Sequence, residues 1–457
     1  MIQLYPHQTT FVQEARNALR NNRSIILRAP TGMGKTICAA HIVDAGLAKS
    51  SNIIFTVHRR ELIKQTMDAF DTCGIPYGVI SAGFKYDPFK SVQIASIDTL
   101  KKRLELIPEP DLMIIDECHH CASSGWASVV SHYDKCKILG LTATPWRLDG
   151  RGLKDFFGAI VHGPEAQWLI DNKFLSPFRA FAPSAPDLSN VHTKMGDYDI
   201  HEIEEQMDTP KLIGDAVEHY KKICNGARAV AFTTTINHSL HVAECFNQEG
   251  IPSAHIDGSM NSGARDESIN KFRNGEIKVL TNCNIVSEGF DVPQMDAAIL
   301  LRPTKSLSLY LQQVGRALRY VEGKTAIILD HAGNIMEHGL PTDSFDWSLE
   351  GRKKNSRVKK DEVKVRTCPT CYCAHEAKLR ICPQCGHTYV VERAQIEQVD
   401  GKLVEINQED WRARMPYKKV LARSRTEEDL YAVAKARGYK NAWVHKILQQ
   451  RRMKGAR

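Results

Sequence analysis

The feature that most constrains the fold of this chain is a repeated alternation of short apolar runs with helix-length stretches. Five such runs precede residue 150, at 24–29, 52–57, 92–97, 112–117 and 138–144. Continuous Ile, Leu and Val are typical of parallel strands that are buried on both faces of a sheet. Their alternation with helices predicts a doubly wound α/β domain over residues 1–165.

The alternation resumes after residue 210, with apolar runs at 229–234, 253–257, 278–283, 297–302 and 325–330. A second doubly wound parallel-sheet domain is therefore predicted over residues 166–345. The stretch NKFLSPFRAFAPSAPDLS interrupts the pattern between the two domains with Pro and Ser residues. A length of 457 residues leaves room for smaller modules beyond them.

Charge and cysteine content divide the remaining chain. Residues 346–366 read as a basic linker, 367–390 as a cysteine-rich module and 391–457 as a basic, partly helical tail. From Arg412 to Arg457 there are 14 Lys/Arg and 3 Asp/Glu, so this segment carries +11 and the rest of the chain −3. A basic arm of this kind is typical of a segment that meets a polyanion, although a solvated helical face gives the same composition.

The sequence argues against membrane insertion and secretion. No apolar run reaches the ~18 residues that a membrane span needs, and no signal peptide opens the chain. Eight of the 13 cysteines are scattered without disulfide-like spacing. A reducing cytoplasm is therefore expected, with no membrane partner.

The stretch APTGMGKT follows an apolar run and opens a helical one, which is the setting of a phosphate-binding loop. Gly32 and Gly34 let the backbone approach phosphate oxygens, and the following helix adds its N-terminal dipole. Lys35 is expected to reach the β/γ-phosphates and Thr36 to bind Mg²⁺ through its hydroxyl. Ala29 stands where the usual pattern has its first glycine, and an incidental glycine turn is the alternative.

Two adjacent carboxylates end the apolar run LMIIDE about eighty residues later. A phosphate–Mg²⁺ site needs one acid to hold the metal and another to orient the attacking water. Asp116 is assigned the first role and Glu117 the second, against the alternative of exposed acids at a strand end. His119 and His120 follow, but adjacent residues rarely converge on one ion, so we expect His119 to link the nucleotide site to its surroundings.

These motifs resemble those of superfamily 2 helicases, in the branch that includes type III restriction helicases. APTGMGKT, DECHH and LTATP resemble motifs I, II and III, and YLQQVGRALR resembles motif VI, in which Arg316 and Arg319 share one helix face. The resemblance implies two tandem RecA-like domains, with ATP and Mg²⁺ held between them. Arginines on the second domain would then stabilise charge on the transferring phosphoryl group, and hydrolysis would reopen the cleft. The catalytic candidates are Lys35, Asp116, Glu117, Arg316 and Arg319.

The same resemblance implies further contacts. LYPHQ lies where the family carries an adenine-reading glutamine, and LTNCNIVSEGFDVP resembles motif V, in which two residues approach the nucleotide. Segments similar to motifs Ia, Ib, IV and V imply contacts to nucleic acid, although each of the first two is also an ordinary strand-to-helix turn. The expected nucleotide-binding residues are Tyr5, Gln8, Thr31, Gly32, Gly34, Lys35, Thr36, Gly289, Asp291 and Gln312. The expected nucleic-acid contacts are His58, Arg59, Ser96, Thr99, Thr234 and Thr281.

Two Cys-x₂-Cys pairs separated by ten residues predict one tetrahedral Zn²⁺ site. The expected ligands are Cys368, Cys371, Cys382 and Cys385. So small a segment cannot bury enough apolar surface to fold alone, so the metal would supply its folding free energy. Cys373 is the nearest substitute ligand, and His375 and His387 are expected outside the site.

The zinc ribbon and the basic aromatic tail favour DNA binding, with docking of a protein partner as the competing interpretation. Together with TATPWRLDG, they resemble bacterial RadD-like and phage-borne DNA helicases, which implies a cytoplasmic DNA motor for branched or forked DNA in repair, recombination or replication. The alternatives are a restriction-type motor subunit, an RNA helicase, and a non-enzymatic scaffold. The intact set of catalytic candidates argues against the scaffold.

Overall fold

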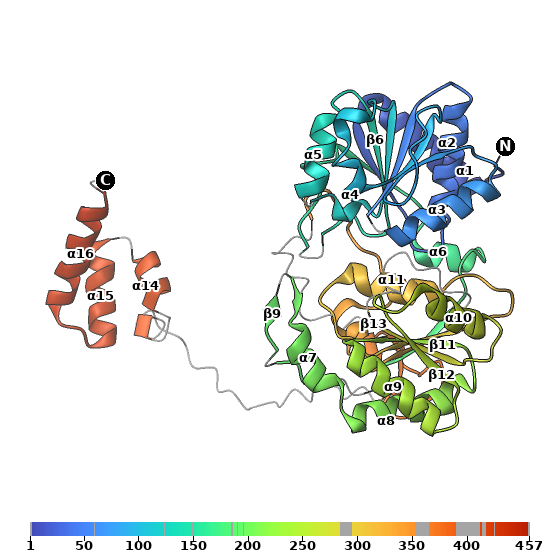
Figure 1. Ribbon diagram of the computed structural model, residues 1–457. Helices are drawn as coiled ribbons and strands as arrows, with labels where there is room; N and C mark the ends of the chain where they lie inside the picture. The colour runs from blue at the N-terminus through green and yellow to red at the C-terminus, as the bar shows by residue number, and fades with distance from the viewer. Residues whose placement is uncertain are drawn as a thin grey trace. The chain divides into compact units, whose positions relative to one another are not determined.

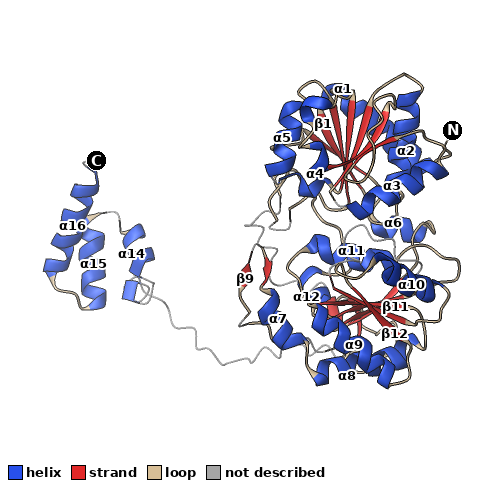
Figure 2. Ribbon diagram, viewed as in Figure 1, coloured by secondary structure: helices blue, strands red, loops and turns tan. Residues whose placement is uncertain are grey.

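The computed structural model describes residues 2–58, 60–122, 124–147, 150–183, 186–189, 191–194, 196–283, 295–351, 365–389, 412–413, 417–424 and 426–455. The chain divides into two compact units, Met1–Tyr389 and Val390–Arg457 (Figure 1). The larger unit contains two sheets, each flanked by helices (Figure 2). This confirms the predicted class of two tandem α/β domains.

The first sheet has seven strands in the order β3-β4-β2-β5-β6-β1-β7, and all of its pairings are parallel. The five predicted runs form β1, β2, β4, β5 and β6, while the short edge strands β3 and β7 were not predicted. The strands are β1 (Ser24–Arg28), β2 (Ile53–Val57), β3 (Gly78–Ile80), β4 (Val92–Ser96), β5 (Leu112–Asp116), β6 (Lys137–Thr142) and β7 (Ala159–His162).

Both faces of this sheet are buried, as continuous apolar runs require. In β1, Ile25 and Leu27 join one apolar cluster and Ile26 joins another. Helices α1 to α3 pack on the first face, and α4 and α5 pack on the second. The helices are α1 (Pro6–Asn21), α2 (Lys35–Leu47), α3 (Arg60–Thr72), α4 (Ile97–Leu100), η1 (Leu104–Leu106), η2 (Cys118–Ala122) and α5 (Ser124–His132), and α6 (Ala166–Asp171) leads to the second domain.

The second sheet has the order β12-β13-β11-β14-β15-β8-β17-β16. Its first six strands are parallel, as predicted, but β17 and β16 add antiparallel pairings at the edge. Strand β17 belongs to the cysteine-rich segment, which therefore continues this sheet. The strands are β8 (Phe178–Phe181), β11 (Ala229–Thr233), β12 (Ser253–Ile256), β13 (Val279–Cys283), β14 (Ala297–Leu300), β15 (Ala326–Asp330), β16 (Val365–Thr367) and β17 (Cys373–Glu376).

The helices of the second domain pack around this sheet, with α9 against β12 and β13 and α11 against β14 and β15. They are α7 (Ile200–Met207), α8 (Pro210–His219), η3 (Tyr220–Cys224), α9 (Ile236–Gln248), α10 (Ser262–Arg273), α11 (Leu307–Ala317) and α12 (Asn334–His338). A two-stranded ribbon of β9 (Thr193–Lys194) and β10 (Asp197–Tyr198) stands apart from the main sheet. The smaller unit contains α14 (Tyr417–Arg423), α15 (Glu427–Arg437) and α16 (Asn441–Gly455).

A segment that follows α12 returns to the first domain. Trp347 packs on Trp146 with ring centroids 4.6 Å apart, and the indole N–H of Trp146 donates to the Ser348 carbonyl at 2.9 Å. The backbones meet so closely that a Cβ on Gly152 would lie 1.8 Å from the Leu349 carbonyl oxygen. The two domains are therefore joined at residues 347–351 as well as through the chain that links them.

Candidate functional site

The phosphate-binding loop has the backbone that its glycines predict. Gly32 and Gly34 adopt φ values of +90° and +91°, in the left-handed region that favours glycine. Space is restricted as well, because a Cβ on Gly34 would lie 2.5 Å from the side-chain nitrogen of Gln8. The loop therefore excludes side chains at both positions, which keeps its backbone open to a phosphate group.

Lys35 and Thr36 begin α2 directly after this loop. The Lys35 ammonium donates to the carbonyls of Ala29 and Pro30, at 2.9 and 3.3 Å, so it bridges the loop from within. Burial lowers the pKa of Lys35, while the charges of Glu117 and Asp116 act in the opposite direction. Thr36 and Asp116, the two expected Mg²⁺ ligands, line one pocket of about 860 Å³.

Gln8 supports the loop from α1. Its side-chain amide donates to the Met33 carbonyl at 2.9 Å, and its carbonyl oxygen accepts from the Tyr5 N–H at 3.0 Å. The amide of Gln8 therefore holds the loop while its carbonyl oxygen caps the start of α1, and reading of adenine by this side chain stays a prediction.

An aromatic pocket of about 670 Å³ is lined in part by α1, including His7, the neighbour of Gln8 in the sequence. His7, Trp168 and Phe174 line it, and the rings of His7 and Phe174 lie 4.2 Å apart. Tyr5 is 59% exposed and meets Phe174 edge-on at 5.0 Å. Sequence analysis missed Trp168 and Phe174 because they come from the segment between the domains and carry no motif.

The two carboxylates lie where β5 ends. Glu117 has a φ of +49°, unusual for a residue with a side chain, and its N–H donates to the Asp116 carboxylate at 3.1 Å. Burial and the charge of Glu117 raise the pKa of Asp116. Burial also opposes ionisation of Glu117, but hydrogen bonding to His119 and the charges of His119 and Lys35 lower its pKa. The pair therefore provides one readily ionised carboxylate next to Lys35.

His119 connects Glu117 to the next strand, as expected of it. Its Nδ1 lies 3.2 Å from a Glu117 carboxylate oxygen and 3.1 Å from the Thr142 hydroxyl. Thr142 in turn donates to the Thr144 carbonyl, and the Thr144 hydroxyl donates to Ser308 of α11 at 2.6 Å. A continuous polar chain thus joins the acidic pair to the second domain.

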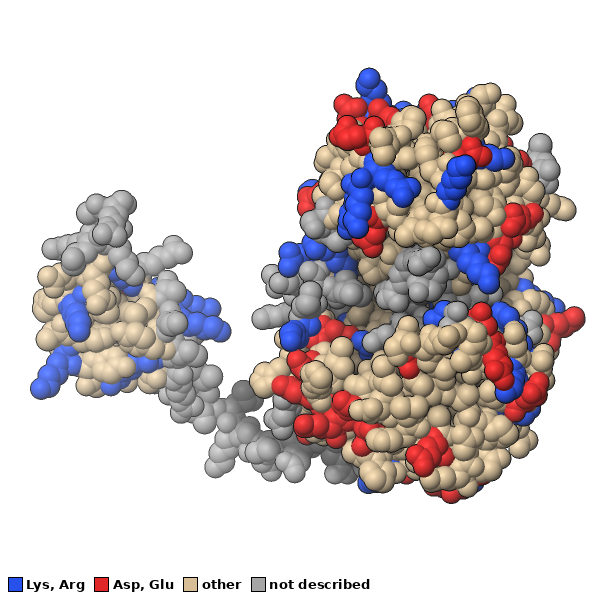
Figure 3. All heavy atoms as spheres, in the orientation of Figure 1, with Lys and Arg blue, Asp and Glu red and all other residues tan. Residues whose placement is uncertain are grey.

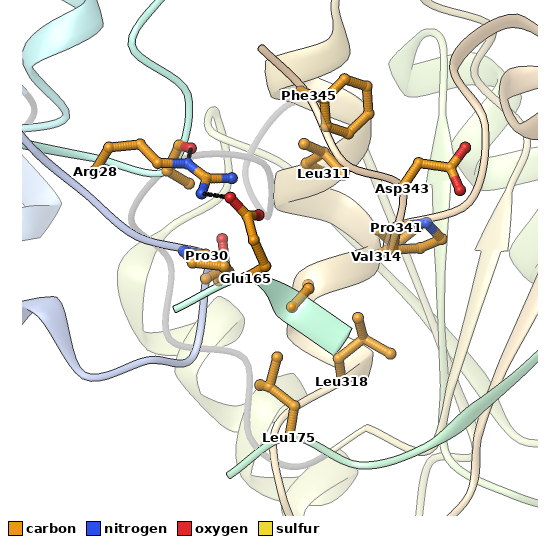
Figure 4. A pocket seen from close by; sticks show the side chains of 14 residues that line it. Arg28, Pro30, Glu165, Leu175, Leu311, Val314, Leu318, Pro341, Asp343 and Phe345 are labelled. Atoms are coloured by element: carbon orange, nitrogen blue, oxygen red, sulfur yellow. Dashed lines mark hydrogen bonds and ion pairs between the residues drawn. The ribbon is translucent and has the colours of Figure 1, made fainter. Parts of the chain in front are cut away.

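Helix α11 lies directly over the phosphate-binding loop. A Cβ on Gly315 would lie 2.8 Å from the Thr31 Cβ, so only glycine permits this approach. A pocket of about 40 Å³ separates the two elements nearby, where Arg28 and Glu165 point toward each other and pair at 2.8 Å (Figure 4). Gln312 is buried and Arg316 is half-buried on this helix. Arg319 was predicted to share a helix face with Arg316, but α11 ends at Ala317, and the half-buried Arg319 lies beyond it, where its backbone pairs with that of Leu175. The structure therefore brings the motif VI helix to the loop that carries Lys35.

Comparison with known proteins identifies the family. Residues 1–147 match the family described as "Type III restriction enzyme, res subunit", and residues 213–321 match "Helicase conserved C-terminal domain". The chain is 35% identical over 369 residues to a "51.5 kDa protein" of a Lactococcus phage, across 80% of this chain and 78% of that protein. It belongs to the superfamily 2 helicases of the restriction-enzyme-like branch.

A further relative agrees with this assignment, and a solved structure shares the fold. The helicase is 30% identical over 348 residues to the "Putative ATP-dependent helicase IRC3" of Saccharomyces cerevisiae, across 70% of this chain and 50% of that protein. Its fold resembles a fragment of a putative HsdR subunit of a type I restriction enzyme from Vibrio vulnificus, with a TM-score of 0.59 at 20% identity, covering 75% of this chain and 67% of that one. The helicase is therefore an ATP-dependent enzyme that hydrolyses ATP.

The predicted nucleic-acid contacts divide into two groups. Ser96 and Thr99 lie where β4 passes into α4, and the His58 ring lies 4.4 Å from that of His120, beside the acidic pair. Thr234 and Thr281 are buried, as is Ser96, and both threonines are held by hydrogen bonds inside the second domain. The Thr281 hydroxyl donates to the Ser239 carbonyl at 2.8 Å, and the Thr234 hydroxyl lies 2.9 Å from His238, so neither side chain faces a groove. Arg59, Gly289 and Asp291 lie outside the described residues.

The four predicted zinc ligands come together. All four sulfur atoms lie within 4.8 Å of one another, with Cys368 and Cys385 at 3.7 Å and Cys371 and Cys382 at 3.6 Å. Tetrahedral zinc with ~2.3 Å bonds to sulfur would separate the thiolates by about 3.8 Å, so the spacing fits that ion. Neither of the two spare histidines joins this group: His375 contacts the Tyr389 hydroxyl at 2.7 Å and His387 contacts Thr370 at 3.2 Å.

In the part of the chain that the structure describes, no helix combines the length and apolar content needed to cross a lipid bilayer.

Proposed function

We propose that this helicase is a DNA motor that acts on branched or forked DNA in repair, recombination or replication. The observation that carries the motor mechanism is the polar chain from Glu117 through Thr142 and Thr144 to Ser308. This chain of contacts crosses from the acidic pair to α11. A change in the contacts of Glu117 on hydrolysis would therefore alter the hydrogen bond that Thr144 makes to the second domain. The DNA assignment is supported by the match to a restriction-enzyme subunit and by the basic tail.

Each domain would contribute different groups to the site. Lys35 and the loop amides would hold the phosphates, Thr36 and Asp116 would hold Mg²⁺, and the metal would neutralise charge on the phosphates. Glu117 would orient the attacking water, while Arg316 on α11 and Arg319 just beyond its end would act from the second domain. Since both domains contact the phosphates only before hydrolysis, loss of that shared contact favours reopening.

The aromatic pocket beside Gln8 is proposed as the site of the adenine base. His7 and Phe174 form an aromatic wall of the pocket against which a planar base can stack, and the exposed ring of Tyr5 packs against both of them. The proposal also places the enzyme in a reducing compartment such as the cytoplasm of a bacterial or phage-infected cell. Its support is the phage relative and the thirteen cysteines, all of which are free thiols.

The proposed substrate is tested by the rate of ATP hydrolysis with single-stranded, duplex, forked and four-way DNA at equal nucleotide concentration. We expect stimulation by DNA, strongest with the forked and four-way substrates, and little with a single-stranded or duplex RNA of the same length. Stimulation by RNA alone would contradict the DNA assignment and favour the RNA helicase.

A restriction-type motor subunit is the second candidate, because the first domain matches the family of such subunits. A motor of that kind would depend on a separate nuclease chain. DNA stimulation of the purified single chain favours the autonomous helicase, and stimulation that appears only on addition of a co-purifying partner favours the subunit.

We further propose that the cysteine cluster holds one zinc ion. Because β17 pairs with β8, loss of the metal is expected to free the edge of the second sheet as well as the ribbon. Metal analysis of the purified chain should find about one zinc per chain, and Cys382→Ser should lose it together with several degrees of thermal stability. Cys245→Ser, at a half-buried cysteine outside the cluster, is the control. A metal-free wild-type protein of unchanged stability would contradict the site.

A further inference from the structure

The smaller unit has its own apolar core. Helices α14, α15 and α16 pack around Leu430, Ala434, Val444 and Ile447. A capping box at Thr426 begins α15, and Gly438, with a φ of +67°, ends it and turns the chain into α16. These contacts fix where the remaining side chains of the unit lie.

Three aromatic residues gather at the surface of this unit. The Trp443 ring lies 5.0 Å from that of Tyr439 and 6.3 Å from that of Tyr417, and the Trp443 indole N–H donates to the Tyr417 hydroxyl at 3.2 Å. Tyr417 and Tyr439 are 42% and 38% exposed. Trp443 is half-buried and packs against the apolar core, so the two tyrosines present most of the exposed ring surface. We call these three residues the aromatic platform.

Charge is distributed unevenly around the platform. The three acidic residues of the segment Arg412–Arg457 are Glu427, Glu428 and Asp429, and all stand in the first turn of α15. The platform lies beyond the opposite end of that helix, which is about 16 Å away for eleven residues. Lys440 and Lys446 flank Trp443 in the sequence and are exposed. On the face seen in Figure 3, this unit shows Lys and Arg without Asp or Glu.

We propose that the aromatic platform binds single-stranded nucleic acid, with unpaired bases stacked on Trp443 and Tyr439. The phosphates would be held by Lys440 and Lys446 and by Lys419, which is exposed two residues after Tyr417 in the sequence. Stacking of a base needs a free ring face, which a base inside a duplex does not offer, so the ligand is an unpaired strand. The inference rests on the proposed function as a nucleic-acid motor and names the form of the polymer that the tail recognises.

Charge and aromatic character together select this ligand over its competitors. Contact with the phosphate backbone alone would need the lysines but no exposed rings. An acidic protein partner would also suit the lysines, and a base-independent result in the test below would favour it. A strand of unpaired bases uses both features at once.

The test uses the full-length protein, free of nucleotide, and two labelled strands of fifteen nucleotides, one of thymidines and one of abasic sites. Both strands carry the same phosphates, so only the first can stack. Trp443→Ala and the double variant with Tyr439→Ala should weaken binding of the thymidine strand roughly five- to hundredfold. Binding of the abasic strand should change less than about twofold, since its contacts are electrostatic.

Two controls separate stacking from folding. Trp443→Phe keeps a ring and should retain most of the affinity, while Phe89→Ala removes a 93% exposed ring from the larger unit and should change nothing. A strand with 5-iododeoxyuridine should crosslink under ultraviolet light to Trp443 or Tyr439, as mapped by mass spectrometry of the peptides.

The outcomes are distinct for the two proposals. Equal loss of affinity for both strands, or no loss and no crosslink at the platform, would overturn the inference. If base-dependent binding is found but no nucleic acid stimulates ATP hydrolysis, the platform stands and the proposed motor function fails.

Discussion

Replacing Arg316 by alanine is expected to lower kcat for ATP about 10³- to 10⁵-fold while ATP binding remains measurable. The residue follows Gly315, whose close approach to Thr31 brings α11 onto the phosphate-binding loop. A guanidinium at this place stabilises charge that develops only as the phosphoryl group transfers, so its loss affects turnover more than binding. Single-turnover hydrolysis and nucleotide affinity, measured separately, check this difference.

The matched variants test the role of geometry. Arg316→Lys keeps the positive charge but not the planar donor pair, so it should recover only part of the rate. Lys271→Ala removes a cation of the same domain that pairs with Glu267 at the surface, and it should leave the rate unchanged. Equal, modest losses in kcat and in ATP affinity for Arg316→Ala would mean that the arginine acts in binding and not in turnover.

The parts of the site that the sequence predicts are those encoded by neighbouring residues. Gly32, Gly34 and Lys35 form a loop whose shape follows from their order, and Asp116 and Glu117 must emerge where a buried strand ends. The helix with Gln312 and Arg316 was predicted from its resemblance to motif VI. Its contact with Thr31 became visible only in the structure, because Gly315 is also an ordinary helix residue in the sequence.

The remaining features depend on residues distant in the chain. Gln8 was predicted to read a base, and that role stays a prediction, but its contact with Met33, 25 residues away, also holds the loop and follows no local pattern. Thr281 was predicted to face nucleic acid, yet it lies inside β13, a strand whose residues are all buried, and the motif by itself does not reveal how deeply its strand is buried. The pairing of β17 with β8 joins segments almost two hundred residues apart, and no hydrophobic periodicity in the sequence predicts it.

The contact between the domains at Trp347 also joins residues that are distant in the chain, so the sequence does not predict it. Two tryptophans and two glycines give no local pattern, but Trp347 stacks beside Trp146 and lies under the Arg28 guanidinium at 4.8 Å. Since Arg28 ends the strand that leads into the phosphate-binding loop, this contact lies close to the nucleotide site. Complementarity of that kind is a property of the folded surfaces and cannot be seen in either segment alone.

Replacing Glu117 by glutamine is expected to lower ATP turnover about 10²- to 10⁴-fold. The substitution preserves size but removes the carboxylate that would orient the attacking water, which His119 and Lys35 keep ionised. Since Asp116 and Thr36 are untouched, binding of ATP with Mg²⁺ should persist, and the variant should accumulate the ATP-bound state. Rapid-quench hydrolysis and filter binding of labelled ATP measure the two properties.

Two further variants in the first domain show whether Glu117→Gln lowers turnover by losing the water-orienting carboxylate or by disturbing the fold. Glu105→Gln, at an exposed residue of the same domain, should behave as wild type. His119→Ala removes the hydrogen bond to Glu117 and the link to Thr142, so it should slow turnover less than Glu117→Gln but weaken its stimulation by nucleic acid. If Glu117→Gln hydrolysed ATP at the normal rate, the water-orienting group would have to lie elsewhere, and the polar chain to Ser308 would no longer begin at the reacting phosphate.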